Sequence, residues 1–143
     1  MIDAAASAYC LPPVKCQWET VTEEGRTVLI VTVEKSEERP VRARETDGQK
    51  RAFVRIDDEN IVASPVHLAL WKRQEATDGS FIPFNEKELR ILKVLQQTPS
   101  GLTLNQFYRK AGINRHKAIR LLADYIRFGL VEMVFQNHTF YFK

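Results

Sequence analysis

Three consecutive acids, Asp57, Asp58 and Glu59, follow a strand-like run in the stretch FVRIDDENIVAS. Carboxylates gathered in one place can hold Mg²⁺ and support hydrolysis of a phosphodiester. Consecutive side chains of an extended chain point in opposite directions, however, so three neighbours rarely reach one ion. We therefore interpret the three acids as a solvated turn at the end of a strand, with a Mg²⁺-dependent nuclease as the alternative.

The other residue types that could do chemistry form no recognisable set. Cys10 and Cys16 have neither a CxxC nor a zinc spacing, and His67, His116 and His138 are not placed as metal ligands. The chain has no phosphate-binding loop, nucleophile triad or secretory signal, and no apolar run long enough to span a bilayer. The sequence thus predicts a cytoplasmic protein with reduced thiols that is not an enzyme and needs no cofactor.

The charge is unevenly distributed along the chain. Residues 1–80 hold 11 Lys and Arg against 14 Asp and Glu, a net −3, whereas residues 81–143 hold 10 against 4, a net +6. Such asymmetry indicates a polyanionic partner for the C-terminal part. A solvated basic surface is the alternative.

A predicted helix from Arg115 to Phe128 carries much of this positive charge. At about 100° per residue, its apolar residues gather on one side, and His116, Lys117, Arg120, Asp124 and Arg127 gather on the other. An exposed basic face of this kind is what a recognition helix presents to a DNA major groove. With the flanking cations, the predicted DNA-binding residues are Arg109, Lys110, Arg115, His116, Lys117, Arg120 and Arg127.

The elements around this helix follow the order of a winged helix-turn-helix. Asn85 with Glu88, Thr103 and Asn114 are placed to cap three successive helices, and the last two are separated by a short GIN turn. Strand-like runs at residues 130–135 and 139–142 then flank Gln136-Asn137 as a β-hairpin. We assign residues 84–143 to this domain, although its wing tip QNHT lacks Arg and Lys, and winged helices also dock proteins.

The N-terminal part is predicted to be rich in β-strands. A short helix over residues 2–10 precedes a half-buried strand at 14–22 and a central strand at 26–34, which is apolar on both faces. Strands at 40–45 and 50–56 flank Asp47-Gly48, a strong hairpin signal. Ser64-Pro65 then starts a helix of about ten residues. We assign residues 1–74 to this domain and residues 75–83 to a linker.

A two-residue turn at Asp47-Gly48 would set Arg44 opposite Arg51 and Arg42 opposite Phe53. Arg42, Arg44, Arg51 and Arg55 would then share one face of the hairpin, since residues two apart point the same way. Either Glu19 and Glu34 on neighbouring strands neutralise them, which we favour, or the four form a second nucleic-acid surface.

The run from AYCLPPVKCQWETVTEEGRTVLIVTVEKSEERP through RAFVRIDDENIVAS resembles the second half of the Schlafen-type, AlbA-like DNA-binding domain. The resemblance covers about residues 8–74 and rests on Pro12-Pro13, Gly25 to Val33, Pro40, Ala52 to Ile56 and Ile61 to Ser64. The first half of that domain, with its E-F-K and Gly-Gly segments, has no counterpart here. The resemblance implies a C-terminal half domain joined to a winged helix, as in bacterial transcriptional regulators, and it assigns no catalytic residue.

The sequence therefore predicts an α+β protein, in which a small antiparallel β-rich half domain is followed by a winged helix-turn-helix. The expected function is transcriptional regulation through double-stranded DNA, with a homodimer formed by the N-terminal half. The alternatives are a non-enzymatic protein-interaction module, in which the winged helix docks a partner, and the inactive C-terminal half of a nucleic-acid-processing enzyme.

Overall fold

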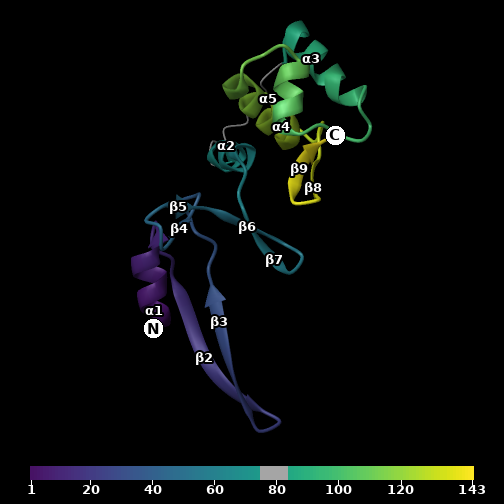
Figure 1. Ribbon diagram of the computed structural model, residues 1–143. Helices are drawn as coiled ribbons and strands as arrows, with labels where there is room; N and C mark the ends of the chain where they lie inside the picture. Colours follow the sequence, from purple (N-terminus) through teal and green to yellow (C-terminus); the bar gives the residue numbers. More distant parts are fainter. Residues whose placement is uncertain (75–83) are drawn as a thin grey trace. The chain divides into compact units, whose positions relative to one another are not determined.

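The computed structural model describes residues 1–74 and 84–143 (Figure 1), so the predicted linker at 75–83 lies outside the described residues. The chain divides into two compact units, Met1–Val62 and Ala63–Lys143. The first is rich in antiparallel β-strands, and the second consists of helices followed by a β-hairpin. The predicted α+β class is confirmed.

The N-terminal unit begins with the short helix that the sequence predicts, and continues as strands. The elements are α1 (Ile2–Ala4), the π-helical turn η1 (Ala5–Tyr9), β1 (Cys10–Leu11), β2 (Cys16–Glu23), β3 (Arg26–Val33), β4 (Arg42–Arg44), β5 (Lys50–Arg51), β6 (Phe53–Ile56) and β7 (Glu59–Val62). The strands pair in three separate antiparallel groups, β1-β4-β5, β2-β3 and β6-β7.

The β2-β3 pair is a long two-stranded ribbon (Figure 1) whose apolar side chains are exposed. Trp18 of β2 is 52% exposed, and Ile30 and Val31 of β3 are 40% and 43% exposed. The prediction of a half-buried strand followed by a central strand is therefore wrong. Among the described residues β3 pairs only with β2, so nothing covers the faces that its β-branched sequence was expected to bury.

The hairpin around Asp47-Gly48 forms, but its register differs from the prediction. The backbone N–H of Glu45 donates to the carbonyl of Gln49 at 2.8 Å, so the loop holds three residues instead of two. Arg44 consequently faces Lys50, and Arg51 faces Ala43. A slip of one residue moves a side chain to the other face of a strand, so Arg51 lies on the face opposite to Arg44.

Arg42, Arg44, Arg51 and Arg55 therefore do not share one face of a hairpin, contrary to the prediction. Arg42 and Arg44 point away from Arg51, and Arg55 belongs to a different pair of strands. The expected neutralising acids are also different from those that the structure uses. Ion pairs join Arg51 to Asp47 at 2.6 Å and to Glu45 at 3.9 Å, and join Arg55 to Asp58 at 3.5 Å.

The acidic stretch that follows is a turn, as the sequence predicts. Asp57 and Asp58 connect β6 to β7, with Asp57 at a φ of 49°, and Glu59 is the first residue of β7. Within residues 1–74 and 84–143, no three His, Cys, Asp or Glu side chains are grouped so that they could hold a metal ion. The structure thus gives these acids a local role in ending one strand and starting the next.

The C-terminal unit contains α2 (Pro65–Gln74), α3 (Glu86–Gln96), α4 (Leu104–Lys110), α5 (Arg115–Arg127), β8 (Met133–Gln136) and β9 (Thr139–Phe142). The three predicted caps are confirmed: Asn85 and Thr103 form reciprocal capping boxes with Glu88 and Gln106, and Asn114 caps α5. From α3 onward this is the element order of a winged helix. None of the described helices is long and apolar enough to cross a membrane.

The hairpin of β8 and β9, which we call the wing, turns one residue later than predicted. Asn137 and His138 occupy the two turn positions, both with positive φ, 49° and 57°. Positive φ at both central residues defines the type I′ turn that matches the twist of a two-residue hairpin. At its far end the wing is tied to the domain by Leu102, which bridges to Phe142.

The core of the C-terminal unit includes α2. Tyr125, Phe107 and Phe142 are among its fully buried side chains, and so is Val66 of α2. The rings of His67 and Phe140 of the wing pack edge to face, with centroids 4.8 Å apart. The helix that the sequence placed in the first domain therefore packs within the second, and the boundary between the compact units follows Val62.

We predict that the chain self-associates through the β2-β3 ribbon. Residues opposite each other in an antiparallel pair share a face, and one face of the ribbon carries no charge: Cys16, Trp18, Thr20, Thr22, Thr27, Leu29, Val31 and Val33. Light scattering at micromolar concentration should give a dimer mass, and Trp18→Ser with Val31→Thr should give a monomer. The exposed Leu89→Ser in the other unit is the control. A folded wild-type monomer would contradict the prediction.

Candidate nucleic-acid interface

The first turn of α5 is the most open basic segment of the predicted recognition helix. Gly112, at a φ of 62°, ends α4, and Asn114 accepts the backbone N–H of Lys117 at 2.8 Å to start α5. Arg115 and His116 are exposed and Lys117 is half-buried. The short turn thus brings three basic side chains together at the positive end of the helix dipole.

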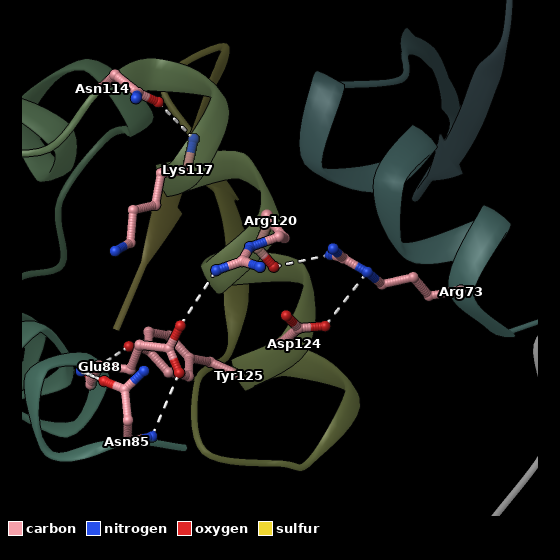
Figure 2. A network of polar contacts seen from close by, with 8 residues as sticks. All are labelled: Arg73, Asn85, Glu88, Asn114, Lys117, Arg120, Asp124 and Tyr125. Atoms are coloured by element: carbon pink, nitrogen blue, oxygen red, sulfur yellow. Dashed lines mark hydrogen bonds and ion pairs between the residues drawn. The ribbon is translucent and has the colours of Figure 1, made fainter. Parts of the chain in front are cut away.

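One flank of α5 is fixed to α3 through Glu88 (Figure 2). The Glu88 carboxylate accepts from Arg120 at 3.1 Å and from the backbone N–H of Asn85 at 3.3 Å. The hydroxyl of Tyr125 donates to the Glu88 carbonyl at 2.5 Å. The side chain of Glu88 is only 12% exposed. Arg120, predicted to face DNA, is therefore held by a carboxylate of its own domain.

The other polar contact of α5 is with α2, through Arg73. Its guanidinium Nε lies 3.3 Å from Oδ1 of Asp124, and its Nη1 donates to the carbonyl of Arg120 at 2.8 Å (Figure 2). Asp124 is only 6% exposed. Its predicted position on the exposed face of the helix is therefore wrong, because a projection of one helix cannot show that α2 packs against it.

Burial shifts the pKa values of two residues in the second half of α5. Burial raises the pKa of Asp124, although the guanidinium groups of Arg73 and Arg120 pull it back down. Burial also raises the pKa of Tyr125, with a smaller contribution from the charges of Glu88 and Asp124. Among the described residues, no donor forms a hydrogen bond to Oδ1 of Asp124. Arg73 and Asp124 therefore form an ion pair without a hydrogen bond at that oxygen.

The remaining predicted DNA-binding residues lie in different settings. Arg109 is exposed at the end of α4, and Lys110 beside it donates to the Thr98 hydroxyl at 2.9 Å. Arg127 is half-buried, with its guanidinium carbon 5.9 Å from the ring centroid of Phe128. The seven residues thus differ in exposure and in the groups they contact.

Two of these residues share a depression in the surface, and a third lines a separate one. Lys110 and Lys117 line one depression, between α3 and the α4–α5 turn. Arg115 lines another, next to Thr103 at the start of α4 and Phe140 of the wing. The first turn of α5 is therefore a ridge with Lys117 on one side and Arg115 on the other.

The first depression contains two cations that the sequence reasoning missed, Lys87 and Arg90 of α3. A signal for them exists in the sequence. Lys87, Arg90, Ile91 and Val94 follow the i, i+3, i+4, i+7 spacing that places residues on one face of a helix. Only the fold, however, sets that face beside Lys110 and Lys117.

Comparison with known proteins assigns neither a family nor a fold to the chain. No family model matches the chain, and no solved structure matches it. Over 81 residues, 56% of this chain, it is 32% identical to an uncharacterized protein of Pyrococcus horikoshii and 27% identical to one of Pyrococcus abyssi. The match covers 24% of the length of each relative. The resemblance to the AlbA-like domain remains a prediction.

Loss of either partner of the ion pair between Arg73 and Asp124 should lower the stability of the domain, and loss of Arg73 should lower it more. Arg73→Met should lower the free energy of unfolding by about 3–5 kcal/mol, because it leaves a buried carboxylate without its cation. Asp124→Asn should cost less, since the Arg73 side chain is 26% exposed and still reaches water. In the Asp124→Asn background the cost of Arg73→Met should shrink by about 1 kcal/mol or more. Urea unfolding of the wild type, the two single variants and the double variant measures these costs, and the exposed Lys72→Met is the control. If the costs of the two single variants simply add in the double variant, the two residues are not coupled.

The cost of Arg73→Met should also depend on pH. A carboxyl group whose pKa is higher in the folded than in the unfolded state, as for Asp124, gives stability that is present at low pH and is lost as pH rises through the folded pKa. Removing Arg73 removes a cation that lowers this pKa, so the variant should regain stability on acidification. Its loss relative to wild type should be smaller near about pH 4 than at about pH 7. Urea unfolding at both pH values tests this, and a cost that does not change would rule it out.

Proposed function

We propose that the C-terminal unit binds double-stranded DNA and that the protein is a transcriptional regulator. The proposal rests mainly on the exposed first turn of α5. Arg115, His116 and Lys117 are presented there, after a short turn, in a domain whose element order is that of a winged helix. The net charge of +6 over residues 81–143 supports a polyanionic partner.

The proposed contact uses the beginning of α5 instead of its whole length. In helix-turn-helix proteins the N-terminal residues of the recognition helix are those that reach base edges. Here Arg115 and His116 are exposed, whereas Arg120 is paired with Glu88 and Asp124 is buried. We therefore assign groove contact to Arg115 and His116, and give Arg120 a mainly structural role.

For the N-terminal unit we propose a role in assembly. The AlbA-like resemblance and the uncharged face of β2-β3 both favour a second copy as its partner. Two winged helices held by one dimer could read two half-sites about one DNA turn apart. Each half-site would then contribute its own phosphate contacts.

Docking of a protein is the second candidate function of the winged helix. Two observations favour it: the wing tip, residues 136–139, carries no Lys or Arg, and Phe128 and Leu130 after α5 are 39% and 48% exposed. Exposed apolar side chains are common anchors in protein interfaces. This alternative predicts a chain that fails to bind DNA even when salt is low.

Titration of labelled duplexes by fluorescence anisotropy at several salt concentrations tests DNA binding. The logarithm of the binding constant should fall against log salt with a slope of about −0.9 for each phosphate contacted. Arg115→Ala should weaken binding by about 1–3 kcal/mol if it reads a base, unequally between sequences, and equally between sequences if it meets a phosphate.

Lys72→Ala is the matched control, since Lys72 is an exposed cation on α2 of the same unit. It should leave the affinity nearly unchanged. Absence of duplex binding at low salt would reject the proposal in favour of protein docking. Equal losses from Lys72→Ala and Arg115→Ala would reject the assignment of the contact to α5.

A further inference from the structure

A basic depression lies between α3 and the α4–α5 turn. It has a volume of about 460 Å³, and its lining contains four cations and no acid. The cations come from three segments of the chain: Lys87 and Arg90 from α3, Lys110 from the end of α4, and Lys117 from the first turn of α5. We call this group the four-cation depression.

The positive charge of the depression is poorly neutralised from within the protein. Among the described residues no carboxylate lies within ion-pair distance of Lys87, Lys110 or Lys117. Arg90 pairs with Glu86 at 3.4 Å, but the two side chains are 77% and 90% exposed. An ion pair so open to water is worth little, so it competes weakly with an external anion.

The lining of the depression suits a chain of phosphates better than a peptide. A docked peptide helix needs exposed apolar side chains as anchors. Of the apolar residues that line the depression, Ile91 is buried and Val94 and Ile113 are half-buried. The exposed large apolar residues of this unit do not line it: Leu89, Phe128 and Leu130. Lys87 and Arg90, three residues apart, lie on one face of α3, so both can meet the same stretch of a phosphate backbone.

We infer that the four-cation depression binds the sugar–phosphate backbone of a nucleic acid duplex, independently of base sequence. The inference rests on the proposed DNA-binding function and extends it to Lys87 and Arg90. Lys117 and Arg115 lie on the two sides of the first turn of α5, so a duplex that straddles this turn would meet both surfaces. Backbone contacts of this kind fix the register of a protein on DNA, while base contacts supply the specificity.

The double variant Lys87→Gln with Arg90→Gln tests the inference on the full chain. The slope of log binding constant against log salt should become less steep by about 1.8, which corresponds to two phosphate contacts. The loss of affinity should be the same for duplexes of different sequence. Lys93→Gln is the matched control, because Lys93 is an exposed lysine of α3 outside the depression. Lys87→Arg with Arg90→Lys should retain the wild-type slope.

The outcomes separate this inference from the function on which it rests. One outcome would overturn the inference about the depression and keep the proposed function. In that outcome Arg115→Ala weakens binding, but the Lys87→Gln/Arg90→Gln variant has the wild-type salt slope. Failure of the wild type to bind any duplex would overturn both. If the double variant lost affinity for polyglutamate but not for duplex, the depression would be a site for an acidic protein instead. Thermal melting of each variant, expected to match wild type, excludes misfolding as the cause of a changed slope.

Discussion

The two ion pairs of α5 are the constraint on which the winged-helix unit depends. Glu88 of α3 pairs with Arg120, and Arg73 of α2 pairs with the buried Asp124, so α5 is joined to two other helices by ion pairs. An isolated buried charge is costly, whereas a paired one is tolerated. These helices must therefore pack together, and the predicted recognition helix loses part of its exposed face to its own domain.

What this packing leaves open defines the proposed interface. The first turn of α5 is free of these pairs, and it is there that Arg115, His116 and Lys117 reach the surface beside the cations of α3 and α4. Two of the acids of this unit serve the fold: Glu88 caps α3 and pairs with Arg120, and Asp124 pairs with Arg73. Positive charge is thus left in surplus on the surface next to the start of α5.

Local signals in the sequence predicted local structure well. The caps at Asn85, Thr103 and Asn114 depend on side chains within three residues of their partners, and all three are confirmed. Errors came where the outcome depends on distant residues or on one hydrogen bond. The apolar pattern of β3 could not reveal the lack of a neighbouring strand, and Asp124 could not be recognised as buried without α2. The register of the hairpin differs from the prediction because the hydrogen bond between Glu45 and Gln49 closes a three-residue loop.

The central claim is that a duplex meets the start of α5 while Arg120 and Asp124 keep their ion pairs with Glu88 and Arg73. The most direct measurement is amide NMR of the ¹⁵N-labelled chain, titrated with a duplex at low salt. The account predicts shift changes at residues 109–117 and at Lys87 and Arg90, with Ala123, Asp124 and α2 unaffected. Changes centred on Ala123 to Arg127, or no changes at all, would contradict it.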